Sequence, residues 1–302
     1  MEPLVLKVNE TTLEKMKKYY DSQLVPCEDT ALLFKAQTIG CEIIVKQDGT
    51  VEFKGQNALS ETQHWSKKIK KKIDSIDQNE DVYSLHHIGS AETGSTDYLG
   101  PICVVSCYVS DEDIAWIKDL KIGKVENLTT QEIVKYAKLL KDRLVYSLLI
   151  LDNSHYNKMV QEGLNQANIK SKLYNQAIVN VMQKLKQSVK IKVITQFVSP
   201  KTYFNYLKNE VIVVRDLMFE VNAQDRYLAV LAAEILSKYA YLQYFANMSK
   251  SLKMNLVRGT STAVDNIAVT IATKYGPKML NKVAKLNFTN TKRVKSIMAE
   301  TK

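Results

Sequence analysis

One carboxylate, Glu92, lies where the sequence could support metal-assisted chemistry. It ends an apolar stretch that reads as a strand, "YSLHHIGSAE", and it precedes a turn that carries Gly94. Magnesium prefers oxygen ligands and normally takes several of them, so Glu92 alone does not make a metal site.

Other side chains that bind metals do not form a recognisable set. The cysteines are Cys27, Cys41, Cys103 and Cys107; none belongs to a CxxC pair, and the four histidines complete no zinc pattern. Cys103 and Cys107 lie in the apolar run "PICVVSCYVS", which predicts two small core residues.

The chain from residue 83 onward alternates between strand and helix patterns, as an α/β domain does. The strand candidates are "YSLHHIGSAE", "PICVVSCYVS", "VYSLLILD" and "VKIKVITQF". The helix candidates are "TTQEIVKYAKLLKDRL", the segment 156–187 and the apolar "DRYLAVLAAEILSKYAYLQYF". Thr129 or Thr130 with Glu132 offers a capping box for the first helix. The polar tail "FTNTKRVKSIMAETK" is expected to fray.

Residues 1 to about 66 predict a small α+β unit. The stretch "TTLEKMKKYY" has helical spacing, with Thr11 or Thr12 as its cap. Strand alternation follows in "LLFKAQTIGCEIIVKQDGTVEFKG", where Asp48-Gly49 marks a hairpin turn. Segment 67–82 is rich in charge and predicts a basic linker, read either as a solvated helix or as an arm that contacts phosphates.

Several motifs, in order and at matching spacing, resemble one family. They include "IGSAETGSTDYLGPICVV", the segment 146–178, "LAVLAAEILSKYAYL" and "GPKMLNKVAKLNFTNT". With its N-terminal unit, the chain resembles bacterial ribonuclease HIII, a type 2 ribonuclease H. The resemblance implies an α/β fold, with a ribonuclease H-like mixed sheet flanked by helices at 83–302. It also implies that residues 1–66 fold like half of a TATA-binding protein and help to hold the substrate, with the linker at 67–82 between the two domains.

Members of this family cut the RNA strand of RNA/DNA hybrids with two magnesium or manganese ions held by four carboxylates. By the resemblance, three of those carboxylates are replaced here, by Ala91, Thr195 and Gln224, and only Glu92 is retained. The family's glycine loop ends here in Thr96, and its lysine-bearing "Asp-Ser-Lys" stretch aligns with 124–126, where Glu126 replaces the lysine.

The resemblance therefore suggests a protein that binds RNA/DNA hybrid or duplex nucleic acid but has lost hydrolysis, with magnesium or manganese weakly bound or absent. A net charge of +10 and a pI near 9.2 favour polyanionic partners. The predicted nucleic-acid contacts are Gly94, Ser95, Thr96, Tyr98, Arg258 and Gly259.

Two alternatives stay open at this point. The first is an active or weakened endoribonuclease in which Glu92 works with Glu234 or Asp225. The second is a protein-interaction scaffold that no longer binds nucleic acid. The sequence has no run of about 18 apolar residues and no signal-peptide pattern, so we expect a cytoplasmic protein without a membrane span. The resemblance implies a monomer.

Overall fold

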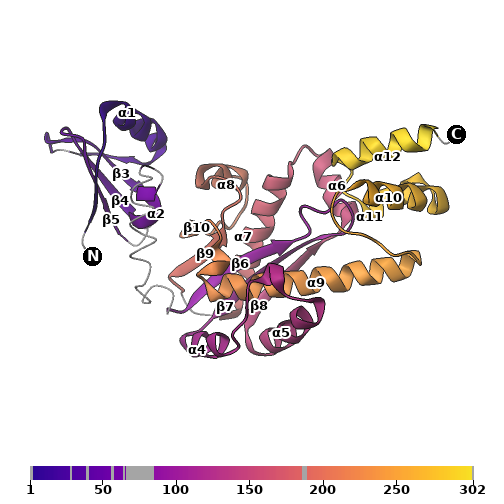
Figure 1. The fold of residues 1–302 in the computed structure, drawn as a ribbon. Helices are drawn as coiled ribbons and strands as arrows, with labels where there is room; N and C mark the ends of the chain where they lie inside the picture. Colours follow the sequence, from indigo (N-terminus) through magenta and orange to yellow (C-terminus); the bar gives the residue numbers. More distant parts are fainter. Residues whose placement is uncertain are drawn as a thin grey trace. The chain divides into compact units, whose positions relative to one another are not determined.

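The computed structural model describes residues 3–27, 29–38, 41–55, 58–63, 65, 85–185 and 189–300. The linker predicted at 67–82 lies outside the described residues. The chain forms two compact units, and the second starts at Leu85 (Figure 1).

The first unit is an antiparallel sheet in the order β1-β5-β4-β3-β2 with helices packed on one face. Its elements are β1 (Leu4–Lys7), α1 (Glu10–Tyr19), β2 (Leu24–Val25), β3 (Leu32–Thr38), β4 (Cys41–Lys46), β5 (Thr50–Lys54) and α2 (Ala58–Gln63). Met16 and Tyr20 are buried against Ile43 and Phe53 of the sheet. The amphipathic helix therefore contributes Leu13, Met16 and its C-cap residue Tyr20 to this core.

The local turn signals of this unit predict one feature correctly and miss another. The hairpin at Asp48-Gly49 is confirmed, because Gly49 joins β4 to β5 with a φ of +83°. The predicted cap of α1 is wrong. Asn9, rather than Thr11 or Thr12, is the N-cap, and its side chain accepts a hydrogen bond from the Thr12 amide at 3.0 Å.

The second unit is built on a mixed sheet in the order β10-β9-β6-β7-β8, with β6 parallel to β9 and antiparallel to β7. Its strands are β6 (His87–Thr93), β7 (Ile102–Val109), β8 (Val145–Leu151), β9 (Ile191–Thr195) and β10 (Met218–Glu220). Its helices are α4 (Asp111–Asp119), α5 (Thr130–Arg143), α6 (Asn153–Gln161), α7 (Gln166–Leu185), α8 (Pro200–Tyr206), α9 (Leu228–Leu252), α10 (Thr262–Tyr275), α11 (Leu280–Val283) and α12 (Thr289–Glu300). Short 3₁₀ turns occur at η1 (Asp21–Gln23), η2 (Val125–Asn127), η3 (Ala223–Asp225) and η4 (Pro277–Met279).

Most elements of this unit follow the sequence patterns. The predicted capping box of α5 is present, with Thr129 and Glu132 bonded reciprocally, and Cys103 and Cys107 are buried in β7 as expected. The expectation of a frayed tail is wrong, because residues 289–300 form α12. That helix is held by side chains from a distant segment, which no local pattern could reveal.

The long helix α9 lies directly against the central strand β6 (Figure 1). A Cβ atom added at Gly89 would lie 2.3 Å from the backbone nitrogen of Val230, so only glycine permits this approach. The buried His87 bridges the same two elements. Its Nε2 accepts the Ala229 amide at 3.0 Å, and its Nδ1 donates to the Leu85 carbonyl at 2.8 Å.

No helix in the described part of the chain is long and apolar enough to cross a membrane.

We predict that His87 makes stability depend on pH. Burial lowers the pKa of His87, and protonation would remove the acceptor for Ala229. The unfolded chain takes up this proton near pH 6.5, whereas the folded chain resists it, so stability should fall as pH drops below about 6.5. Thermal unfolding from pH 7.5 to pH 5 should show a shallower loss in His87→Gln than in the wild type.

An unchanged slope in His87→Gln would contradict the assignment. His87→Leu should in addition lower stability at pH 7.5 by about 1–3 kcal/mol, because the Ala229 amide is then buried without an acceptor.

Candidate functional site

The three positions assigned to lost carboxylates lie at the same ends of neighbouring elements. The parallel register pairs Ser90 with Ile194, which brings Ala91 level with Thr195 on the adjacent strand. Thr195 ends β9, and its hydroxyl lies 3.5 Å from Oε1 of Gln224 in η3. Neutral or apolar side chains therefore occupy the place where four acidic groups would have to converge.

Glu92, the retained carboxylate, is fully engaged by neighbouring groups. Ser95 donates to it twice, from Oγ at 2.6 Å and from the backbone amide at 3.4 Å. Lys170 of α7 places Nζ 2.8 Å from Oε1, and both side chains are only 13% exposed. The Lys170 ammonium also lies 4.4 Å from the ring centroid of Phe197. The ammonium of Lys170 thus neutralises Glu92, the acid that the sequence singled out as a metal ligand.

The residues present do not fit a two-metal centre. Within the described ranges, no group of three or more His, Cys, Asp or Glu side chains is placed to hold a metal ion. Two dications would need several oxygen ligands, whereas Ala91, Thr195 and Gln224 provide no carboxylate and Glu92 is paired with a lysine.

The acids considered as substitutes face a neighbouring pocket. Glu234, Asp225 and Glu126 line a cavity of about 480 Å³ that Gln224 also borders. Burial raises the pKa of Glu234, the nearby Asp225 and Glu126 carboxylates raise it further, and Lys238 opposes them. Glu234 therefore favours its protonated form more than an exposed glutamate does.

The loop after Glu92 has a shape that only glycine permits at its first position. Gly94 has a φ of +96°, and a Cβ there would meet the Pro101 carbonyl at 2.3 Å and the Tyr241 ring at 2.6 Å. Ser95 is buried because its hydroxyl is bonded to Glu92, whereas Thr96 is exposed. Of the side chains predicted in this loop to meet nucleic acid, Thr96 is the one available.

Tyr98 was predicted as a nucleic-acid contact, and the structure contradicts this for its side chain. The residue is fully buried, and its hydroxyl pairs with Oγ1 of Thr291 at 3.1 Å. Its backbone amide instead donates to the Gly259 carbonyl at 3.0 Å. Tyr98 therefore joins the two predicted contact loops instead of projecting from one of them.

The loop that carries Arg258 and Gly259 is fastened to the first loop. The Gly259 amide donates to Oδ1 of Asp97 at 2.8 Å, next to the bond from the Tyr98 amide. Arg258 itself is exposed. Thr96 and Arg258 thus project from two loops that are held together by their backbones.

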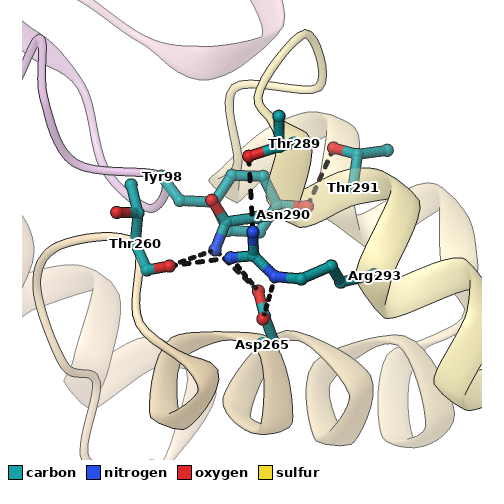
Figure 2. Close-up of polar contacts among 7 residues, drawn as sticks. All are labelled: Tyr98, Thr260, Asp265, Thr289, Asn290, Thr291 and Arg293. Atoms are coloured by element: carbon teal, nitrogen blue, oxygen red, sulfur yellow. Dashed lines mark hydrogen bonds and ion pairs between the residues drawn. The ribbon is translucent and has the colours of Figure 1, made fainter.

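A buried acid, Asp265, anchors the second loop from below (Figure 2). It accepts hydrogen bonds from Asn290 and Arg293 of α12, both at 2.6 Å. The same two side chains donate to the Thr260 carbonyl, at 3.1 Å and 2.7 Å. Helix α12 therefore fixes the backbone next to Arg258.

A buried lysine, Lys285, anchors the first loop. Its ammonium donates to the carbonyls of Asp97 at 2.8 Å and Gly100 at 2.6 Å, and burial lowers its pKa to about 8. Sequence reasoning missed Lys285, Lys170 and Asp265. The one local signal was a lysine between apolar residues in "VAKL", because the partners of all three are distant in sequence.

Comparison with known proteins identifies relatives of this chain along nearly its whole length. The family model described as "Ribonuclease HII" matches residues 88–291, and "Domain of unknown function (DUF3378)" matches residues 3–77. The chain is 33% identical to ribonuclease HIII of Bacillus velezensis, over 99% of this chain and 98% of that protein. It is also 33% identical to ribonuclease HIII of Bacillus subtilis, over 98% of each. The crystal structure of Bst-RNase HIII in complex with Mn²⁺ aligns with a TM-score of 0.71 and 25% identity, over 99% of each chain.

We predict that the Lys170–Glu92 pair stabilises the fold. Lys170→Met leaves a largely buried carboxylate without a counter-ion and should lower the free energy of unfolding by about 3 kcal/mol in urea titrations. Adding Glu92→Gln to this variant should restore much of the loss, because no uncompensated charge remains.

Lys172→Met is the matched control on the same helix. Its partner Glu210 is 35% exposed, so the loss should stay below about 1 kcal/mol. Equal losses of unfolding free energy in the two lysine variants would show that the Lys170–Glu92 pair stabilises the fold no more than an exposed pair does.

Proposed function

The chain belongs to the ribonuclease HIII family, and on that premise we propose that it binds RNA/DNA hybrid or duplex nucleic acid without hydrolysing it. The observation that carries the proposal is the state of Glu92, which is bonded to Lys170 and Ser95 beside neutral residues at 91, 195 and 224. Bst-RNase HIII forms a complex with Mn²⁺, and that relative therefore binds a divalent metal. The residues of this chain do not support the same metal chemistry.

Binding would rest on the two loops that the buried anchors hold in place. Phosphate contacts from cationic side chains and backbone amides position a protein on nucleic acid without reading sequence. Arg258 and Thr96 are both exposed on these loops. Lys285 and Asp265 fix the two loops beneath them and would act as positioning residues.

The N-terminal unit would add a second contact surface on the open face of its sheet. That face carries Lys35, Lys46 and Lys54, which pair with Glu42 or Glu52. The three lysine side chains are 33% to 42% exposed in these pairs, so a phosphate would reach their ammonium groups. A monomer and a cytoplasmic location complete the proposal, and both rest on the resemblance to the family.

We predict that the wild type binds a labelled RNA/DNA hybrid and forms no cleavage product in magnesium or in manganese. Association should weaken with salt, with log K falling linearly against log salt concentration. Arg258→Ala should weaken binding and reduce that slope by about one, while Arg143→Ala, at a distant ion pair with Asp113, should leave it unchanged. Manganese-dependent products that disappear in Glu92→Gln would overturn the proposal and support the weakened-endonuclease alternative.

Carboxylates introduced at positions 91, 195 and 224 should restore hydrolysis if the rest of the site is intact. The triple variant Ala91→Asp, Thr195→Asp and Gln224→Glu should gain a manganese-dependent rise in melting temperature and cleave the hybrid. The melting curve without metal reports whether the variant folds. A folded variant that binds manganese but does not cleave the hybrid would show that the loops at Thr96 and 124–126, and not the ligands alone, abolish hydrolysis.

A further inference from the structure

The outer edge of the second sheet is formed by β8, a strand without charged residues of its own. Strand β8 ends the sheet order and, in the described part of the chain, pairs only with β7. Its sequence, "VYSLLIL", contains no charged residue and no proline. Proteins usually protect such edges with lysines, prolines or bulges, because an unpaired edge is a template for another strand.

The alternation of β8 shows which backbone groups face outward. Lys184 of α7 donates to the carbonyl of Tyr146 at 2.6 Å, which places that carbonyl on the open edge. In an antiparallel ladder, every second residue faces the same neighbour, so the backbone groups of Leu148 and Ile150 also face outward. Ser147 lies between Tyr146 and Leu148, and its side chain points to the other face of the sheet, where it accepts a hydrogen bond from Asn180 of α7.

The same alternate residues border an apolar groove. A cavity of about 300 Å³ is lined by Tyr146, Leu148 and Ile150 of β8 and by Leu236, Tyr239 and Tyr244 of α9. Leu148 is 38% exposed and Ile150 is 45% exposed. An unpaired backbone edge therefore lies beside a pocket for alternate apolar side chains, which is the arrangement that binds an added strand.

The positive charge beside this groove indicates which kind of protein segment would bind there. Lys141 of α5 lines the cavity, and Lys184 lies over the Tyr146 ring with Nζ 5.9 Å from its centroid. A second copy of the chain, with its net charge of +10, would bring the same lysines to the same edge. A segment in which apolar and acidic residues alternate would fill the pocket with one face and present its carboxylates to Lys184 with the other.

We propose that β8 binds an extended segment of a partner protein, in which apolar and acidic residues alternate, by adding it as a strand to the edge. The apolar side chains of the segment fill the groove between β8 and α9. Its carboxylates lie on the opposite face of the added strand and meet Lys184 of α7. This surface is independent of the loops assigned to nucleic acid.

The test uses the full chain and a panel of labelled peptides of about nine residues that alternate leucine or isoleucine with glutamate. We expect micromolar binding by fluorescence anisotropy and new protection of the Leu148 and Ile150 amides in hydrogen exchange. Ile150→Lys should weaken binding by about tenfold or more. Leu139→Lys, which changes a residue of α5 that is 40% exposed and outside the groove, should leave it within about twofold.

Further probes separate the contributions of backbone and charge. Peptides methylated on the backbone nitrogens that face β8, or carrying lysine in place of glutamate, should not bind. Equal melting temperatures of the two variants exclude misfolding as a cause. The proposal is overturned if no peptide of the panel binds in an Ile150-dependent way, or if sedimentation shows a dimer of the wild type that Ile150→Lys dissociates. The second result would assign the edge to self-association.

Discussion

The close approach of α9 to β6 sets the geometry of the second unit. Because Gly89 has no side chain, the helix backbone lies directly on the central strand, and His87 caps the start of that helix. This contact places η3 and the first turns of α9 beside the ends of β6 and β9. The residues at 91, 195 and 224 meet there because of that packing, whatever their chemistry. A site can therefore lose its ligands while the scaffold around it persists.

Replacing carboxylates by neutral side chains also changes the energy of the fold. Acids that converge to hold metal repel one another when no metal is bound, and such sites are commonly retained at a cost in stability. With alanine, threonine and glutamine in those places, Glu92 is left as a single charge that Lys170 can balance. The acid then serves the loop by accepting the Ser95 bonds. Glu92 is thereby part of the framework of the loop.

Local sequence signals predicted the elements but not the contacts between distant segments. The strands β6 and β7 and the capping box at Thr129 follow from alternation and from a four-residue motif. The cap of α1 was misplaced because Asn9 and the following threonines are all suitable cap residues, and only the backbone conformation decides among them. The order of α12 and the burial of Tyr98 depend on partners such as Asp265 and Thr291, which no window of sequence contains. The family resemblance drew attention to Glu92, which stands in a recognisable motif. Its partner Lys170 is distant in sequence, so the ion pair between them is visible only in the structure.

The anchoring of Thr260 by α12 has a consequence for the order of synthesis. The loop beside Arg258 is fastened by Asn290 and Arg293 (Figure 2), which leave the ribosome some 30 residues after it. Until those residues emerge, the nascent chain has a complete central sheet but lacks the fastening of this loop. A ribosome stalled before α12 would therefore display the central sheet with this loop unfastened, and the loop takes its final form only once α12 has been made.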